Sequence, residues 1–177
     1  MPAIVTPAEI EAAIRNVPDF PKPGIQFKDI TPVLASARLF SGAIDLLTEP
    51  FARGTIDAVV GIDARGFIFA AAAAKKLNAG FVPVRKKGKL PFTTIEEEYA
   101  LEYGNAVVAI HTDALAPGAR VLLIDDLLAT GGTSAAAVVL VEKLGARIVE
   151  ASFLIELVFL NGRSKLNGVP VRSLVKY

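Results

Sequence analysis

The sequence predicts an α/β fold, in which a parallel β-sheet carries helices on both of its faces. One observation is a repeating pattern of strand and helix: an apolar strand at 58–62, an alanine-rich helix at 67–77 and a second strand at 80–84. This alternation is typical of parallel strands joined by crossover helices. The other observation is the run 121–124, whose four residues are all apolar. A strand of this kind is buried on both faces, which indicates helices on each side of the sheet.

The segment before residue 58 is predicted to form a small amino-terminal extension. Thr6 begins a capping box for a short helix, whose apolar residues recur at helical spacing up to Val17. The proline-rich stretch 18–24 is expected to be an extended arm, and the alternating stretch 25–30 a small strand. Ser36 is placed to cap the next helix.

The carboxyl half continues the alternation of strand and helix. Strands are predicted at 105–111 and 147–157, and a helix at 135–144 that Gly145 can end in the left-handed conformation. The sequence shows no internal repeat, linker or low-complexity segment. We therefore expect a single domain over residues 1–177.

The composition excludes several classes of protein. Of the 177 residues, 53% are hydrophobic and 21% are charged, as in a folded globular chain. The net charge of +1 gives no general attraction for nucleic acid, and no apolar run approaches the roughly 18 residues of a membrane span. The lack of cysteine excludes thiolate catalysis, and the single His111 excludes a histidine metal cluster. We expect a cytoplasmic protein that binds neither nucleic acid nor membranes.

The residues with functional chemistry follow the strand 121–124. Asp125 and Asp126 mark its expected carboxyl end, where open α/β sheets bind ligands and where a following helix directs N–H groups at an anion. The turn after them supplies glycines, which let the backbone come close to a ligand, and hydroxyl donors: Thr130, Gly131, Gly132, Thr133 and Ser134. We interpret this turn as a phosphate cradle.

The paired acids separate this turn from other phosphate sites. The turn has no lysine, so the common P-loop motif is absent. Vicinal carboxylates suit a ribose or a metal: one can accept hydrogen bonds from hydroxyls, and the other can help to hold Mg²⁺. A strand followed by a capped helix with solvated acids, or the acid pocket of a receiver domain, would give a similar pattern.

A dense basic segment follows another strand of the predicted sheet. Residues 85–89 contain four cations and come directly after the strand 80–84. Because carboxyl ends of parallel strands meet at one edge, this segment should lie beside the turn 63–66 and the cradle. Such a cluster suits a highly charged anionic ligand.

The run 121–134 resembles the binding signature for 5-phosphoribosyl 1-diphosphate (PRPP) of type I phosphoribosyltransferases. Residues 127–133 resemble the variant found in adenine phosphoribosyltransferases. Matching blocks lie in order over most of the chain. The resemblance implies the type I phosphoribosyltransferase fold, with a small hood built mainly from residues 1–35 and a flexible lid loop at 90–103.

The resemblance also implies roles for single residues. The ring of Phe27 would stack on adenine, and Glu102 would be the acid that reaches the base. The implied catalytic residues are Glu102, Asp126 and Arg65. The implied substrate-binding residues are Phe27, Ala64, Lys86, Lys89, Tyr103, Asp125, Asp126, Ala129, Thr130, Gly131, Gly132 and Thr133. From the residues alone, Phe27 could equally be a core residue, Arg65 a surface ion pair and Glu102 a solvated loop charge.

The implied reaction is purine salvage, in which a homodimer converts adenine and PRPP to AMP and diphosphate. Mg²⁺ is the implied cofactor, held mainly by PRPP, with Asp125 the candidate for a contact through water and no metal site from the protein alone. A phosphoribosyltransferase for hypoxanthine, guanine or xanthine is one alternative. Another is a non-catalytic regulator that senses PRPP or a purine, although a chain of this size and charge leaves little room for an added binding surface.

Overall fold

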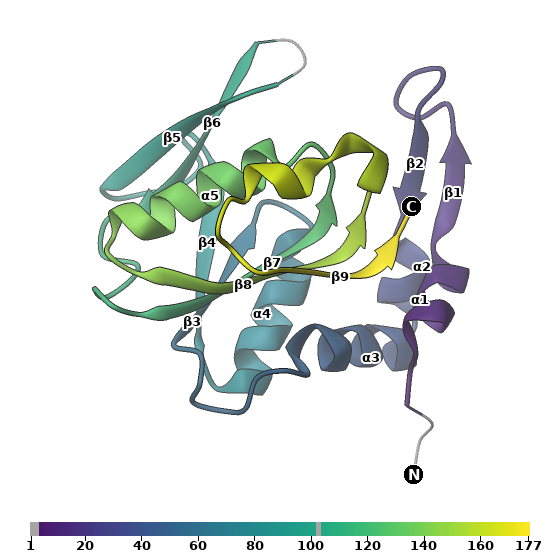
Figure 1. The fold of residues 1–177 in the computed structure, drawn as a ribbon, viewed down its shortest axis with the longest axis horizontal. Coiled ribbons are helices and arrows are strands. Elements are labelled where there is room, and N and C mark those ends of the chain that lie inside the picture. Colours follow the sequence, from purple (N-terminus) through teal and green to yellow (C-terminus); the bar gives the residue numbers. More distant parts are fainter. Residues whose placement is uncertain (1–3, 102–103) are drawn as a thin grey trace. The chain divides into compact units, whose positions relative to one another are not determined.

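The computed structural model describes residues 4–101 and 104–177 (Figure 1). The chain divides into two compact units, Met1–Leu47 and Thr48–Tyr177, which we describe in turn. In the described part of the chain, no helix combines the length and the apolar character needed to cross a membrane.

The first unit contains a helical part and a two-stranded hairpin. Its elements are α1 (Pro7–Ala13), β1 (Arg15–Pro18), β2 (Gln26–Asp29), α2 (Thr31–Ala35) and most of α3 (Ala37–Thr48). The capping box of Thr6 and the cap of α3 by Ser36 are both confirmed. The helical prediction is wrong at Val17, which lies in β1 opposite Phe27 of β2. Because Pro18 disfavours helical geometry in the residue before it, the chain pairs as a hairpin instead.

The second unit is built on one seven-stranded sheet with the order β5-β6-β4-β3-β7-β8-β9. Its strands are β3 (Ala58–Ile62), β4 (Gly80–Lys86), β5 (Thr94–Ala100), β6 (Asn105–His111), β7 (Arg120–Leu128), β8 (Arg147–Glu156) and β9 (Val171–Lys176). The strands from β4 to β9 in this order pair in parallel, whereas β6 and β5 add an antiparallel edge. The predicted α/β architecture is confirmed.

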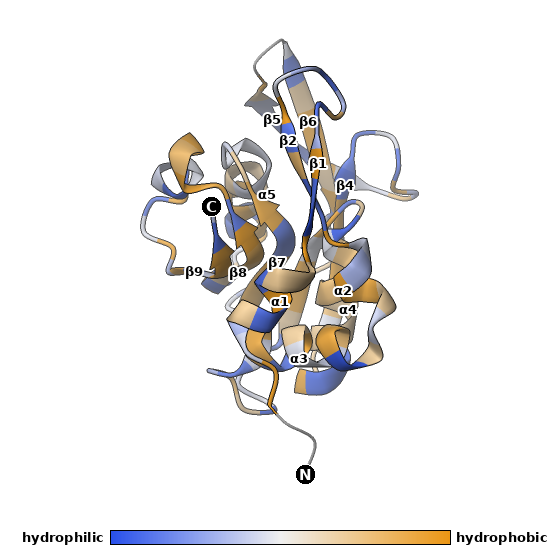
Figure 2. Ribbon diagram, turned by 90° about the vertical axis from the view of Figure 1, so that its right-hand side faces the viewer, coloured by the Kyte–Doolittle hydropathy of each residue, from blue (hydrophilic) through white to orange (hydrophobic). Residues whose placement is uncertain are grey.

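Helices cover both faces of this sheet, as Figure 1 shows for α4 (Gly66–Leu77) and α5 (Gly132–Lys143). Val121 and Leu123 of β7 pack in one buried cluster with Ala137 and other residues of α5. On the opposite face, a β-carbon at Gly61 would contact Ala70 of α4. The strands between the helices are therefore apolar on both sides, which is visible as the hydrophobic colouring of β7 and β8 in Figure 2.

The prediction of a flexible lid loop at 90–103 is wrong in one respect: Thr94–Ala100 form a strand, β5, which pairs along its whole length with β6. The residues of β5 alternate between a half-buried face, with Ile95, Glu97 and Tyr99, and an exposed face, with Glu96, Glu98 and Ala100. On the half-buried face, Ile95 and Tyr99 pack against the core, and Glu97 forms an ion pair with Lys143 of α5. This period of two was present in the sequence but was obscured by three successive glutamates. Motion of the segment stays a prediction, and residues 102–103 lie outside the described part.

Candidate functional site

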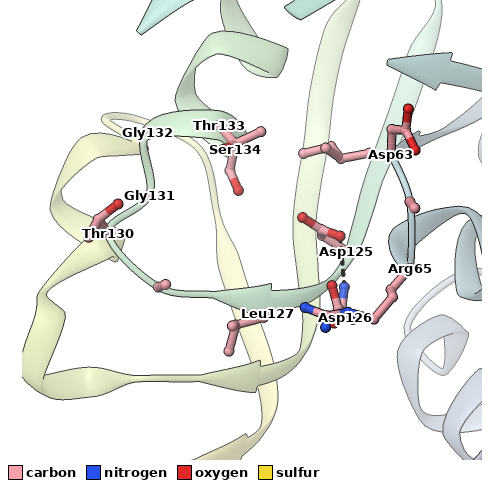
Figure 3. Close-up of a pocket in the computed structure, with 13 residues that line it drawn as sticks. Asp63, Arg65, Asp125, Asp126, Leu127, Thr130, Gly131, Gly132, Thr133 and Ser134 are labelled. Carbon is pink, nitrogen blue, oxygen red and sulfur yellow. Dashed lines mark hydrogen bonds and ion pairs between the residues drawn. The ribbon is translucent and has the colours of Figure 1, made fainter. Parts of the chain in front are cut away.

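A cavity of about 370 Å³ lies at the carboxyl edge of the sheet, between the turn after β3 and the turn after β7. Its lining contains most of the residues singled out from the sequence: Ile62, Asp63, Ala64, Arg65, Asp125, Asp126, Leu127, Ala129, Thr130, Gly131, Gly132, Thr133 and Ser134. Figure 3 shows Asp125 pointing into the space that the turn from Thr130 to Ser134 encloses. Two segments far apart in the sequence therefore form one site.

The turn before α5 has the geometry of an anion cradle. Gly131 precedes the helix with φ +77°, a left-handed conformation that favours glycine. Among the described residues no side chain caps this end of α5. The N–H groups of its first turn thus remain available to a ligand, and the helix dipole favours a negative one. The hydroxyl groups of Thr130, Thr133 and Ser134 line the same space.

The two acids of β7 have different surroundings. Asp126 is buried, with 7% of its surface exposed, and its Oδ2 lies 2.6 Å from Nε of Arg65. Asp125 is half-buried, and its Oδ1 accepts a hydrogen bond from the backbone N–H of Asp126 at 2.9 Å. Burial, and then the adjacent charge of Asp126, raise the pKa of Asp125 well above its ordinary value. Keeping Asp125 charged therefore costs free energy, and a positive or hydrogen-bonding ligand would reduce that cost.

The position of Asp125 depends on a glycine that sequence reasoning missed. A β-carbon at Gly66, the first residue of α4, would lie 2.3 Å from Oδ1 of Asp125. Only glycine leaves room there for the carboxylate. The sequence signal was a glycine directly after Arg65, at the start of a helix where it has no conformational advantage.

The prediction that Asp125 and Asp126 mark the carboxyl end of their strand is wrong. β7 continues past both of them to Leu128, because its pairing with β8 extends as far as Leu128 and Glu156. The carboxylates therefore stand on a hydrogen-bonded strand, which holds them more firmly than a turn would.

The basic segment 85–89 lies at the same edge of the sheet, since Val84 of β4 pairs with Ile62 of β3. Arg85 donates to Oδ2 of Asp63 at 3.0 Å, and Lys87 pairs with Glu96 at 2.7 Å. Lys86 and Lys89 are exposed and form no ion pair with any residue that the structure describes. These two lysines do not line the cavity, but they are the cations of the segment left available to a ligand.

The remaining residues singled out from the sequence are not among the described residues that line the cavity. Phe27 belongs to the first unit, where its half-buried ring meets the ring of Phe20 edge to face at 5.1 Å. Glu102 and Tyr103 lie outside the described residues. His111 bonds through Nε2 to the carbonyl oxygen of Pro91 at 2.5 Å, as a structural contact of the strand end.

Tyr99 is a further contact of the cradle that sequence reasoning missed. A β-carbon at Gly132 would lie 3.1 Å from the Tyr99 ring, so β5 packs directly over the start of α5. For metal binding, residues 4–101 and 104–177 contain no group of three His, Cys, Asp or Glu side chains that could hold an ion. A metal at this site would need ligands from a substrate in addition to Asp125.

Comparisons with known proteins all match this chain to phosphoribosyltransferases. The family model described as the phosphoribosyl transferase domain matches residues 28–166. A protein from Acidothermus cellulolyticus named adenine phosphoribosyltransferase is 56% identical over 167 residues, covering 94% of this chain and 94% of that protein.

Solved structures extend the similarity to the fold. The adenine phosphoribosyltransferase from Thermoanaerobacter pseudethanolicus has a TM-score of 0.93 at 50% identity, over 97% of this chain and 100% of that one. The enzyme from Saccharomyces cerevisiae, in complex with adenine and an imino-altritol bisphosphate, has a TM-score of 0.90 at 44% identity, over 95% and 97% of the two chains.

The electrostatics of Asp125 predict how stability depends on pH. Because folding raises this pKa, the folded chain binds the proton more tightly, and Asp125 lowers stability increasingly as the pH rises above about 3.9, the ordinary pKa of Asp. Asp125→Asn should therefore raise the melting temperature near pH 8, with a gain that shrinks towards pH 4. Asp113→Asn, at an exposed site, is the control and should leave the melting temperature unchanged at both pH 8 and pH 4. A melting temperature for Asp125→Asn equal to that of the unchanged protein at pH 8 would contradict this account.

Proposed function

This chain belongs to the phosphoribosyltransferase family and, within it, to the adenine phosphoribosyltransferases, and we propose that its cavity holds the phosphoribosyl group of PRPP during transfer to adenine. The protein is a purine-salvage pentosyltransferase that converts adenine and PRPP to AMP and diphosphate. The observation that carries the site assignment is that an uncapped helix start and two vicinal carboxylates enclose one cavity.

The cradle binds the 5′-phosphate in this proposal. The backbone of residues 129–133 surrounds the phosphate, Thr130 and Thr133 donate hydroxyl hydrogen bonds, and the start of α5 supplies N–H donors. Asp125 and Asp126 accept hydrogen bonds from the ribose hydroxyls. The phosphoribosyl group is thereby held at both ends before adenine attacks.

The turn after β3 and the basic segment receive the diphosphate. Ala64 contributes its main chain, and Arg65 contributes charge while also orienting Asp126. Lys86 and Lys89 provide the cations that are not engaged elsewhere in the described residues. Mg²⁺, bound mainly by PRPP oxygens with Asp125 as a contact through water, would neutralise charge on the departing diphosphate. The donor set fits this role, since carboxylate oxygens are ligands that Mg²⁺ prefers.

The transfer step develops positive charge on the sugar. Glycosyl transfers proceed through an oxocarbenium-like state at the reacting carbon, and diphosphate is a good leaving group. The carboxylates of Asp125 and Asp126 stabilise that positive charge, and the cations stabilise the leaving group. Phe27 stacks on adenine, while Glu102, with Tyr103 beside it, accepts or returns a proton of the base.

An assay with four purines tests the activity directly. We expect AMP from adenine and PRPP in the presence of Mg²⁺, with much lower turnover of hypoxanthine, guanine and xanthine. Chelation of divalent metal should abolish turnover. Preferred use of another purine would replace the proposed base, and a lack of product with every base would contradict the assignment.

We also propose that the protein is a homodimer. Ile68 of α4 and Phe81 of β4 are large apolar side chains with 41% and 37% of their surface exposed. The ring of Phe81 lies 5.5 Å from that of Phe67, so apolar groups gather there on neighbouring elements. Light scattering should give twice the mass of one chain, and a monomer at micromolar concentration would contradict the proposal.

The cytoplasmic location stays a prediction.

Lys86→Ala should raise the KM for PRPP and lower kcat together, because the charge that Lys86 neutralises grows as diphosphate leaves. We expect a loss of roughly tenfold to a hundredfold in kcat/KM. Lys75→Ala is a matched control, since Lys75 is an exposed lysine in the last turn of α4, away from the helix end that faces the cavity. Equal behaviour of the two variants in steady-state assays would exclude a specific role for Lys86.

Glu102→Gln should lower kcat and leave PRPP affinity nearly unchanged, because glutamine keeps the size of the side chain but cannot exchange a proton. Glu97 is a poor control because it pairs with Lys143 at 2.6 Å. Glu98 is exposed on β5 and serves better. If Glu98→Gln reduces kcat as much as Glu102→Gln does, Glu102 has no catalytic role.

A further inference from the structure

We propose that Gly162 and Arg163 are positioning residues, which hold the cradle from behind and so set the affinity for the 5′-phosphate of PRPP. Both belong to the short 3-10 helix η2 (Gly162–Lys165), which follows η1 (Val158–Leu160) after the end of β8. Neither residue lines the cavity. The inference rests on the proposed function for the identity of the ligand, but its structural basis is independent of it.

The backbone of Gly162 packs directly on the cradle. A β-carbon at Gly162 would lie 2.1 Å from the carbonyl oxygen of Ala129 and 2.8 Å from the amide nitrogen of Gly131. Conversely, a β-carbon at Gly131 would lie 2.2 Å from the carbonyl oxygen of Gly162. The two glycines therefore allow two backbone segments to approach more closely than any side chain would permit.

Gly162 is required for this contact and not for its own conformation. Its φ lies outside the left-handed region, so the backbone there would accept alanine. The residue is nevertheless buried. Gly131 combines both demands, because it has φ +77° and also meets Gly162. The lack of a side chain at Gly131 thus allows Gly162 to pack behind the turn and a phosphate to approach in front of it.

Arg163 fixes η2 to the sheet through a buried carboxylate. Its Nε and Nη2 donate to Oε1 and Oε2 of Glu156 at 3.0 Å and 2.6 Å. Glu156 is only 5% exposed, and Ser173 of β9 also donates to its Oε2. A further guanidinium nitrogen donates to the carbonyl oxygen of Val171. The fork joins β8, β9 and η2, and such bidentate pairs define orientation as well as supplying energy.

The same two strands provide a matched control. Arg172 of β9 donates from Nε to Oε1 of Glu150 of β8 at 2.8 Å, with Ser152 beside it. This cluster also joins β8 to β9 through a partly buried arginine and glutamate. Glu150 and Ser152 both lie on β8 and not on η2, so a loss of Arg172 should weaken the sheet edge without releasing the cradle.

The experiment compares Arg163→Met, Arg163→Lys, Gly162→Ala and Arg172→Met. Arg163→Met and Gly162→Ala should each displace the cradle by about an ångström. We expect this displacement to raise the KM for PRPP by roughly tenfold to a hundredfold. The KM for adenine and kcat should change by no more than about twofold. Arg163→Lys should recover part of the affinity, because lysine can still reach Glu156 with one donor. Arg172→Met should lower the melting temperature but leave the KM for PRPP unchanged.

Binding measurements identify which part of the ligand is affected. Calorimetry should show weaker binding of ribose 5-phosphate to Arg163→Met and Gly162→Ala, by the same factor as the KM, with unchanged binding of diphosphate. Equal effects of Arg163→Met and Arg172→Met on the KM for PRPP would overturn the inference. So would unchanged ribose 5-phosphate binding in Gly162→Ala. A protein that forms no AMP but binds ribose 5-phosphate in this pattern would contradict the proposed function alone.

Discussion

The parallel pairing of β3 with β7 is the constraint on which the site depends. Ala58–Gly61 pair in register with Val121–Ile124, so both strands run towards the same edge of the sheet. The turn at 63–65 and the turn at 129–134 thereby enclose one cavity. An antiparallel pairing would place these turns at opposite edges, and neither would form more than half of the site. The apolar residues that bury the strands between α4 and α5 thus also determine where the ligand binds.

The site is assembled at an electrostatic cost that the ligand offsets. Asp125 and Asp126 are adjacent, and the carboxylate of Asp126 pairs with Arg65. Gly66 leaves space for the carboxylate of Asp125 without supplying a partner. A hydrogen-bonding ribose and a divalent cation would both favour the charged form of Asp125. Binding energy and local stability are therefore opposed here, as is common where a site must recognise charge.

The sequence predicted the strands β3, β4, β6, β7 and β8, the central crossover and most of the cavity lining, because these follow from apolar runs, glycines and hydroxyl groups close together in the chain. It did not predict β9, and it placed β5 in a loop. It failed where the decisive partner is distant in sequence. The role of Gly162 depends on Gly131, and the room for Asp125 depends on Gly66. Ordinary local rules also failed in β5, where tertiary pairing with β6 formed a strand from a run of glutamates. Specificity for adenine came from resemblance alone, since residue chemistry does not distinguish one purine from another.

Amide chemical shifts on titration with ribose 5-phosphate test the central claim most directly. The account predicts saturable changes concentrated at the amides of residues 130–134 and at Asp125 and Asp126, because these surround the cavity. The amides around Gly118, in the turn that precedes β7, should not change. Saturable binding that leaves residues 130–134 unchanged would place the phosphate elsewhere and contradict the assignment of the cradle.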